Sequence, residues 1–182
     1  MTTLLHQNIA KHVALSDRET EQFCNFFKPQ SIRKKQFILQ EGDTCTFEAF
    51  VTKGLFRVYH LDQNGFEQVL YFAMEDWWIT DIDSFTNQRP VYVLISKQDK
   101  DLAFENIPAI EKLFRIMTQK THVALQRRMI DYLGKTADQR YIDFSEKYSL
   151  LAQRLSNIQI AAYLGISHEF LSKIRKKLSL KK

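Results

Sequence analysis

The sequence predicts an α+β protein with strands in its first half and helices in its second. Between Ser31 and Ile95, turn residues separate short runs rich in β-branched and aromatic residues, which is typical of a β-sandwich or barrel. After Ala103 the apolar residues recur every three or four positions, as they do on amphipathic helices. These patterns, with a change in charge near Lys135, predict three segments: 1–105, 106–134 and 135–182.

Local signals justify two elements of the first segment. Helical spacing near the N-terminus predicts a helix, and Ser16 followed by Glu19 has the spacing of a capping box. Further along, Asn64-Gly65 separates the strand-like runs Leu55–Leu61 and Phe66–Phe72. Because Asn and Gly tolerate the positive φ of tight hairpin turns, the sequence predicts a β-hairpin here.

The second segment has the pattern of one long helix. Asn106–Leu133 contains a single proline near its start and no glycine, and at about 1.5 Å per residue it would be roughly 40 Å long. Its apolar side could lie on the β-region or pair with the same helix of a second copy, and the pattern leaves both open. Gly134 would then be a hinge. The paired interpretation places the dimer contacts at Ile110, Phe114, Met117, Thr121 and Ala124.

Composition argues against several classes of protein. With 182 residues, 45% of them hydrophobic, the chain can bury a core, yet no apolar run reaches the roughly 18 residues that span a bilayer. The start lacks a signal-peptide pattern, so a cytoplasmic protein without a membrane partner is expected. Cys24 and Cys45 form no CxxC pair, and we expect both to be free, buried thiols.

No catalytic or metal-binding motif is recognisable. The five histidines lack paired-ligand spacing, and there is no P-loop, GxGxxG or GxSxG sequence. The acidic residues between Glu75 and Asp83 are interrupted by two tryptophans and an isoleucine, which favours solvated carboxylates over a cation site. We therefore expect no enzyme activity, no metal site and no cofactor.

Positive charge is concentrated at the C-terminal end of the chain. Residues 1–134 carry 16 Lys and Arg against 17 Asp and Glu, whereas residues 135–182 carry 10 against 4. A basic segment after a nearly neutral body is typical of a unit that meets a polyanion, and nucleic acid is the commonest one. The many apolar residues among these charges argue against a disordered tail.

The stretch IAAYLGISHEFLSKIRKK, which starts at Ile160, has the small residues of a helix-turn-helix. Two helices that meet at a steep angle need a small residue inside the first helix and one that tolerates left-handed geometry at the turn. Ala161 and Gly165 meet these needs at a spacing of four residues. Apolar anchors complete the motif: Ile160 and Leu164 in the first helix, Ile166 in the turn, and Leu171 and Ile174 in the second helix.

The second helix of this motif would carry the DNA contacts. Its outward residues His168, Glu169 and Lys173 are the candidate base readers, because a carboxylate can accept from cytosine and a lysine can donate to guanine. Ser167 can also cap this helix. The candidate phosphate contacts, which need no base identity, are Ser167, Lys176, Lys177, Lys181 and Lys182.

Together these segments resemble the Crp/Fnr family of bacterial transcription regulators. FILQEGDTCTFEAFVTKGLFRVYHLDQNGFEQVLYF is similar to that family's cyclic-nucleotide-binding-type β-roll, with Gly42, Gly54 and Gly65 in the expected turns. EDWWITDIDSF and IAAYLGISHEFLSKIRKK are similar to its Bacteroidetes-type subgroup. The resemblance implies a jelly-roll sensor domain, a dimerisation helix and a C-terminal helix-turn-helix domain. It also implies a homodimer on a palindromic operator in double-stranded DNA, with RNA polymerase as a further partner.

Two departures from the family pattern change what is expected. Members that bind cyclic nucleotides have a Gly-Glu pair after the aromatic pair and an Arg-Ser/Thr pair soon after, whereas here Ile79-Thr80 follows Trp77-Trp78 and Pro90 follows Arg89. Binding of cyclic AMP (cAMP) is therefore disfavoured. Trp77, Trp78 and Arg89 remain candidates to line a pocket for another effector. The second departure is a missing or reduced wing after the recognition helix.

A second class of function stays open, that of a ligand-binding or protein-interaction module whose helix-turn-helix no longer binds DNA. The positive charge of residues 135–182 favours the regulator, because a degenerate DNA-binding unit has no need of that excess. An aromatic-rich β-region can either enclose a ligand cavity or simply fill its own core.

Overall fold

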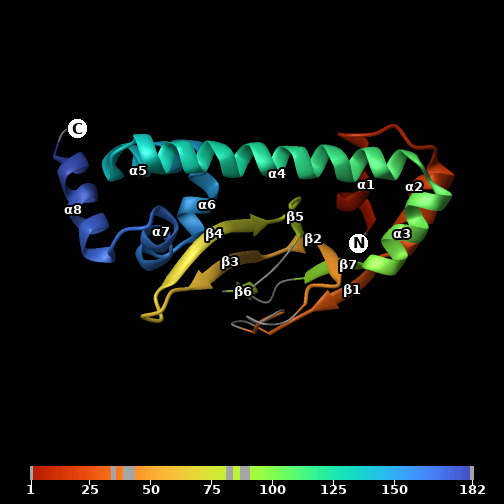
Figure 1. Ribbon diagram of the computed structural model, residues 1–182, viewed down its shortest axis with the longest axis horizontal. Helices are drawn as coiled ribbons and strands as arrows, with labels where there is room; N and C mark the ends of the chain where they lie inside the picture. The colour runs from red at the N-terminus through yellow and green to blue at the C-terminus, as the bar shows by residue number, and fades with distance from the viewer. Residues whose placement is uncertain (1, 34–35, 39–43, 81–83, 87–90, 181–182) are drawn as a thin grey trace. The chain divides into compact units, whose positions relative to one another are not determined.

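Two helices precede the strands and the remaining helices follow them in the computed structural model, which describes residues 2–33, 36–38, 44–80, 84–86 and 91–180 (Figure 1). The mixture of helix and sheet confirms the predicted class. The elements are α1 (Thr2–Ala10), α2 (Asp17–Asn25), β1 (Lys28–Ser31), β2 (Phe47–Lys53), β3 (Leu55–Leu61), β4 (Glu67–Met74), β5 (Trp78–Thr80), β6 (Ser84–Thr86), β7 (Val91–Ser96), α3 (Lys97–Asn106), α4 (Ala109–Gly134), α5 (Ala137–Lys147), α6 (Ser149–Arg154), α7 (Asn157–Leu164) and α8 (His168–Ser179).

The strands form two sheets. One has the order β1-β7-β2-β5 and the other the order β4-β3-β6. The pairs β1·β7, β2·β7, β2·β5 and β3·β6 are antiparallel. In the first sheet Ala49 of β2 lies between Ile79 of β5 and Leu94 of β7. Ala49 and Ile79 are fully buried, so this part of the sheet faces the core.

The predicted hairpin of β3 and β4 is confirmed, although its turn differs in detail from a two-residue Asn-Gly turn. The Gly65 amide donates to the Asp62 carbonyl at 2.9 Å. Within this turn Gly65 is the residue with a positive φ, of 78°. One oxygen of the Asp62 carboxylate accepts from the backbone amides of Asn64 and Phe66 at 2.8 and 2.9 Å. The turn is therefore closed by an aspartate side chain as well as by backbone bonds.

The helices begin and end where local chemistry dictates. The capping box of Ser16 and Glu19 is confirmed at the start of α2, and the N-terminal helical region is two helices, α1 and α2. The long helix begins at Ala109 and not at Asn106, because Pro108 disfavours helical geometry at Ile107, whose φ is −138° and ψ is 83°. The residues before Ile107 form the separate helix α3.

The chain divides into two compact units. The first comprises Met1–Val58 and Phe72–Val123, and the second comprises Tyr59–Tyr71 and Ala124–Lys182. The boundaries differ from the segments 1–105, 106–134 and 135–182, which remain a prediction of functional domains. The tip of the β3–β4 hairpin belongs with the C-terminal helices, and α4 contributes to both units.

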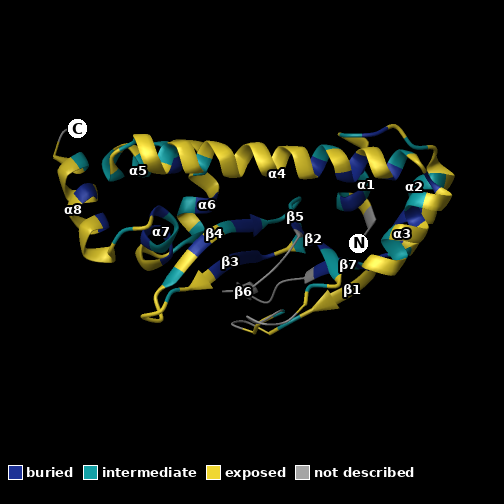
Figure 2. Cartoon of the chain, in the orientation of Figure 1, coloured by how far each residue is buried: buried dark blue, intermediate teal, exposed yellow. Residues whose placement is uncertain are grey.

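Aromatic and aliphatic side chains fill the core of the first unit, and the first half of α4 takes part in it. Phe114 lies 6.3 Å from Phe23, 5.6 Å from Trp78 and 5.5 Å from Phe104, measured between ring centroids. Along α4 the side chains change from buried to exposed (Figure 2). The buried residues of α4 are Ile110, Leu113, Phe114 and Met117.

This burial corrects the predicted dimer contacts. Ile110, Phe114 and Met117 are already buried within one chain, so they have no surface left for a second copy. Thr121 and Ala124 are exposed, but they continue the same line at three- and four-residue spacing and therefore point to the same side of the helix. The periodicity that predicted a dimer face marks the face of α4 that packs into its own chain.

Candidate nucleic-acid interface

The pair α7–α8 is shaped by its caps. Ser156 and Gln159 form a capping box at the start of α7, and Gly165 ends this helix in the left-handed conformation, with φ 66° and ψ 39°. The amides of Gly165 and Ile166 both donate to the Ala161 carbonyl. Ser167 then caps α8 by accepting from the Phe170 amide at 3.2 Å. The turn at Gly165 and the cap at Ser167 were predicted from the sequence, whereas the capping box of Ser156 and Gln159 was not.

Apolar side chains hold the two helices together. Leu171 is fully buried in α8, and Ile166 in the turn is half-buried. The other anchors of the predicted motif are also buried: Ile160, Ala161, Leu164 and Ile174. Because these residues take one side of α8, the opposite side is left to solvent.

The exposed side of α8 carries the predicted base readers. His168, Glu169 and Lys173 are all exposed. The Glu169 carboxylate accepts from its own backbone amide and from Ser167, which lowers its pKa, and it lies 2.8 Å from His168 Nδ1. Glu169 therefore stays ionised as a hydrogen-bond acceptor, and its position is fixed at the start of the helix.

The predicted phosphate contacts differ in their surroundings. Lys176 is exposed on the same side of α8 as Lys173. Lys177 forms an ion pair with Asp138 of α5, so a phosphate would have to compete with that carboxylate. The Ser167 hydroxyl already accepts the capping bond. Lys181 and Lys182 lie outside the described residues.

One exposed aromatic residue on α8 was missed by the sequence analysis. Phe170 lies in the first turn, between Glu169 and Leu171, and 46% of its surface is exposed. Helical periodicity could have found it, since the apolar anchors already assigned Leu171 and Ile174 to the buried side. An exposed phenylalanine beside candidate base readers is a candidate apolar contact to a base.

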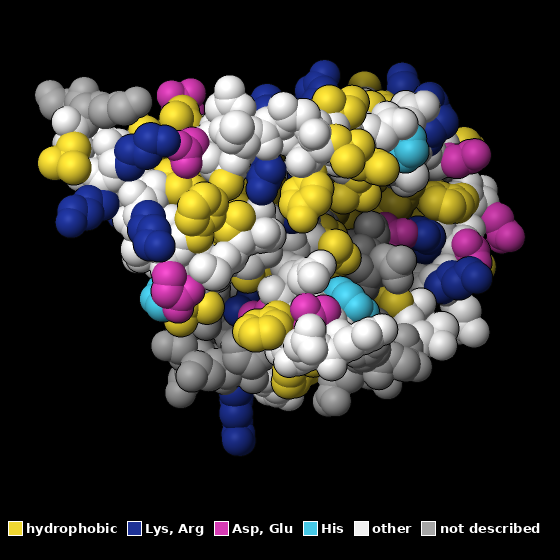
Figure 3. Space-filling model, turned by 60° about the vertical axis from the view of Figure 1, so that its left-hand side comes forward, with side chains coloured by type: hydrophobic (Ala, Val, Ile, Leu, Met, Phe, Trp, Pro, Cys, Tyr) yellow, Lys and Arg dark blue, Asp and Glu magenta, His cyan; other side chains and the backbone are white. Residues whose placement is uncertain are grey.

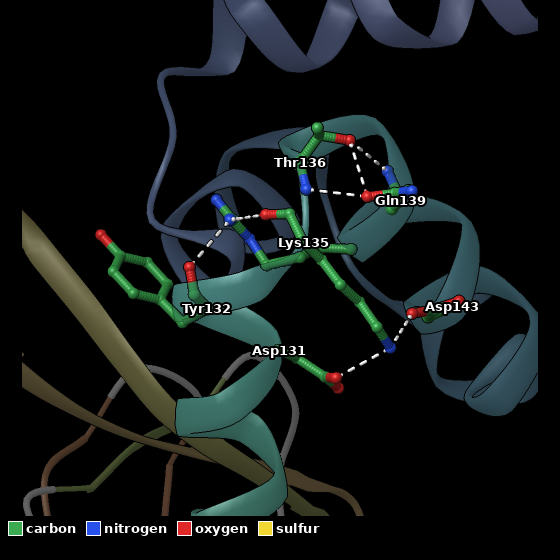
Figure 4. Close-up of polar contacts among 7 residues, drawn as sticks. Asp131, Tyr132, Lys135, Thr136, Gln139 and Asp143 are labelled. Carbon is green, nitrogen blue, oxygen red and sulfur yellow. Dashed lines mark hydrogen bonds and ion pairs between the residues drawn. The ribbon is translucent and has the colours of Figure 1, made fainter.

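The connection from α4 to α5 is heavily bonded (Figure 4). Lys135 Nζ lies 2.7 Å from carboxylate oxygens of both Asp131 and Asp143, and these bonds raise the pKa of Lys135. Thr136 and Gln139 form a capping box at the start of α5. The two residues after Gly134, the predicted hinge, are therefore held in place: Lys135 by its ion pairs with Asp131 and Asp143, and Thr136 by the capping box.

The second half of α4 exposes apolar side chains. Val123, Ile130 and Leu133 recur at spacings of seven and three residues, and the exposed fractions of the last two are 66% and 76%. Leu125 and Met129, elsewhere on this half of the helix, are exposed too. Figure 3 shows hydrophobic side chains exposed among basic ones on the face that it draws. Several neighbouring apolar residues on one helix face are typical of a surface that binds a partner.

The predicted effector pocket of Trp77, Trp78 and Arg89 remains a prediction, because Arg89 lies outside the described residues. Trp78 is half-buried and packs against the core residues Phe27, Phe50 and Phe114, and its Nε1 donates to Asn8 Oδ1 at 2.8 Å. Trp77 is half-buried as well. A cavity of about 240 Å³ lies elsewhere in the first unit. Its lining is Cys45, Thr46, Phe47, Glu48, Ile95, Ser96, Lys97 and Lys100.

Among the described residues, no group of three or more His, Cys, Asp or Glu side chains could hold a metal ion. None of the helices described is both long and apolar enough to cross a membrane. Cys24 is buried and Cys45 half-buried, both as free thiols, and burial raises the pKa of the Cys24 thiol to about 11. Cys24 is therefore an unreactive core residue.

Two sheets, a long helix and a capped helix pair define an α+β protein with separate sheet-rich and helical units, and solved structures identify the fold more closely. FixK2 of Bradyrhizobium japonicum superposes with a TM-score of 0.76 at 19% identity, over 85% of each chain. The c-di-GMP-responsive global regulator CLP of Xanthomonas campestris gives 0.74 at 15% identity, over 91% of this chain and 93% of CLP. A Crp/Fnr-family regulator of Eubacterium rectale gives 0.71 at 14% identity, over 92% and 85%.

The chain therefore has the fold of the Crp/Fnr-type regulators, as its sequence predicted. The likeness extends over most of each chain, so it includes both the strands and the C-terminal helices. No protein-family model matches the chain, and no curated protein does. The Bacteroidetes-type subgroup remains a prediction.

Proposed function

We propose that this protein is a DNA-binding transcription regulator of the Crp/Fnr type and that α7–α8 is its helix-turn-helix. The observation that carries the proposal is the division of α8 into two sides. One side is buried against α7, and the other presents Glu169, Lys173 and Lys176 to solvent after a left-handed turn at Gly165. A second helix held in this way can enter the major groove with its N-terminal residues at the base edges.

The proposed roles follow from the chemistry of each side chain. His168, Glu169 and Lys173 read bases, with Glu169 accepting from cytosine and Lys173 donating to guanine. Lys176 contacts a phosphate, and Lys177 does so only after it leaves Asp138. Lys181 and Lys182 are further phosphate contacts by their charge. We also propose that the sheets form a jelly roll. RNA polymerase is the further partner that we propose.

A homodimer would use the exposed half of α4. Val123, Ile130 and Leu133 form an apolar line on the side of the helix opposite Thr121 and Ala124. Pairing this line with that of a second copy would remove it from water and would place two α8 helices for a palindromic operator. Half-sites about one helical turn of DNA apart would match such a dimer.

Cyclic AMP is not the proposed effector. Ile79 stands where cyclic-nucleotide-binding relatives have glycine, and its side chain is fully buried in β5 opposite Ala49. A side chain that fills the core cannot give way to a phosphate approaching the backbone. The test is calorimetric titration of the protein with cAMP, for which we expect no heat of binding.

Selection from genomic DNA tests the proposal directly. The purified protein is mixed with fragmented DNA from its source, and retained fragments are sequenced across a salt series. We expect a two-fold-symmetric site whose retention falls steeply with salt, because Lys contacts to phosphate release counterions. Retention of no sequence above background, with or without added cell extract, would favour an interaction module that has lost DNA binding.

Substitution of Lys173 separates base reading from phosphate contact. We expect Lys173→Ala to weaken operator binding by about 1–3 kcal/mol and to relax the preference at one base pair. Lys176→Ala is the matched control, since it removes the same charge one turn further along and should weaken all sequences alike. Fluorescence anisotropy with operator and random duplexes measures both, and equal losses for Lys173→Ala on the two duplexes would refute its role.

Phe170 adds an apolar contact to this set. Its exposed ring in the first turn of α8 is suited to the methyl group of a thymine, which is the apolar group of the major groove. Replacing each operator thymine in turn with deoxyuridine removes only that methyl group. We expect one replacement to weaken wild-type binding by about 1 kcal/mol and to leave Phe170→Ala unaffected. If every replacement weakens both proteins equally, Phe170 contacts no methyl group.

A further inference from the structure

Arg128 joins three segments of the second unit. It lies in the exposed half of α4, yet its side chain is half-buried. It donates to the Val69 carbonyl at 2.8 Å and to that of Leu70, both in β4, and to the Tyr163 carbonyl in α7 at 2.6 Å. One side chain thus connects the β3–β4 hairpin, the long helix and the first helix of the proposed helix-turn-helix.

The carbonyl of Tyr163 is a particular kind of acceptor. It lies in the last turn of α7, where carbonyl groups lack partners within the helix and carry the negative end of the helix dipole. Leu164, the next residue, has its carbonyl bonded at 3.3 Å by Arg140 of α5. Two arginines from different helices therefore cap the end of α7, immediately before the turn that sets the direction of α8.

Aromatic rings fix the planes of both guanidinium groups. The Arg128 guanidinium carbon lies 4.1 Å from the centre of the Tyr163 ring, and that of Arg140 lies 4.8 Å from the centre of the Tyr132 ring. Tyr163 also contacts the buried Phe144, with 5.1 Å between ring centroids. The Tyr163 ring thus connects Arg128 to the core of the C-terminal helices.

The contacts of Arg128 depend on the planar geometry of its guanidinium more than on its charge. It donates to carbonyl oxygens and stacks on a ring, and burial lowers the pKa of the guanidinium. Burial likewise raises the pKa of Tyr163, so that ring stays neutral. Only a planar group with several donors can reach carbonyls of two segments while stacked on a ring, and a lysine ammonium has a different geometry.

We propose that Arg128 is a positioning residue for DNA recognition, which makes the orientation of α7–α8 depend on the β3–β4 hairpin. The proposal rests on the DNA-binding function above. The contact does not cover the reading side of α8, because Glu169 and Lys173 are exposed while it is made. It therefore holds the helix pair ready and does not block it. A movement of Val69 and Leu70 is transmitted through one guanidinium to the end of α7.

Arg128→Lys tests the proposal, with Arg127→Lys as the matched control. Arg127 is the neighbouring residue on α4 and is exposed, so the same change there keeps the charge and leaves the hydrogen bonds of Arg128 in place. We expect Arg128→Lys to weaken operator binding about ten-fold, in the usual range of coupling between sites, and to leave binding to random DNA unchanged. Arg127→Lys should bind both DNAs as the wild type does.

Hydrogen exchange supplies a readout that a merely structural role would not move. In the wild type, operator binding should slow amide exchange in residues 59–71, because coupling between two sites is reciprocal. In Arg128→Lys that protection should be lost while the melting temperature and exchange of the free hairpin stay close to wild type. A hairpin whose exchange does not respond to operator in the wild type overturns the proposal without recourse to any variant.

The outcomes distinguish this proposal from the one on which it rests. If the wild type selects no operator, the regulator function fails. If the wild type binds its operator and Arg128→Lys binds it equally well, Arg128 has no positioning role and the regulator function stands. Protection of residues 59–71 that persists in Arg128→Lys would show that DNA contacts the hairpin directly, which also overturns the role of Arg128.

Discussion

Different interactions stabilise the interior of each of the two compact units, and α4 contributes to both. In the first unit α4 contributes Phe114 to a cluster of aromatic rings with Phe23, Trp78 and Phe104. In the second unit it contributes Arg128 and Asp131 to polar contacts with carbonyls and a lysine. The same helix therefore packs by volume at one end and by directional bonds at the other.

This difference has a consequence for what each unit can do. Apolar packing is non-directional and strong, so it contributes most to the free energy of unfolding. Hydrogen bonds from arginine contribute less free energy each, but they fix the orientation of the groups that they join. The free energy of unfolding should accordingly depend on the first half of α4, and assembly and DNA binding on the second.

Removal of the Phe114 ring should have the largest effect. We expect Phe114→Ala to lower the free energy of unfolding by about 3–5 kcal/mol, because it leaves a cavity among aromatic side chains. Leu133→Ala, in the exposed half of the helix, is the control and should change monomer stability by less than about 0.5 kcal/mol. Urea denaturation at low protein concentration measures both. Similar losses for the two variants would mean that the halves of α4 do not differ.

A charge on the outer side of α4 should act on assembly instead. We expect Ile130→Glu to weaken dimerisation by about 2 kcal/mol or more, since two like charges would be buried at the interface, and to leave the fold intact. Thr121→Glu carries the same charge on the opposite side of the same helix. Sedimentation equilibrium on both variants decides between the two sides, and dissociation by Thr121→Glu alone would restore the interface predicted from the sequence.

Features that depend on local spacing were predictable from the sequence. The Ser16–Glu19 capping box, the turn at Gly65, the left-handed Gly165 and the cap at Ser167 each involve residues within four positions of one another. The buried anchors of α7–α8 were also predictable, because helical periodicity assigns them to one side. Similarity in these local patterns supported the prediction of the Crp/Fnr fold that structural comparison then confirmed.

Features that depend on distant partners were not predictable. Periodicity identified an apolar side on α4, but an identical pattern serves a core and a dimer interface, so the sequence left both open for Phe114 and Met117, which the structure places in the core. The bonds of Arg128 left no signal at all, because their acceptors are backbone carbonyls that every residue carries. The role of Trp78, in a ligand pocket or against the core, stayed open for a similar reason, since an aromatic residue does not reveal which side of a sheet it faces.

A substitution in the turn between α7 and α8 should have the smallest effect on stability, because it alters the backbone geometry without removing any packed side chain. Gly165 has a φ of 66°, and a Cβ added there would lie 3.0 Å from Tyr132 Cε2 of α4. We expect Gly165→Ala to destabilise the protein by about 1–2 kcal/mol, the usual cost of left-handed geometry in a residue with a side chain. Gly134→Ala is the matched control.

Gly134 ends α4 without a positive φ and has nothing within 4 Å of an added Cβ, so alanine there should stabilise the helix by up to about 1 kcal/mol. Thermal unfolding of the two variants should therefore shift in opposite directions. Gly165→Ala should also weaken operator binding, because relief of the strain must rotate α8 or move Tyr132, the ring on which Arg140 stacks. A Gly165→Ala protein with wild-type stability and affinity would show that the second unit tolerates a change of direction at this turn, and that its polar contacts do not fix the orientation of α8.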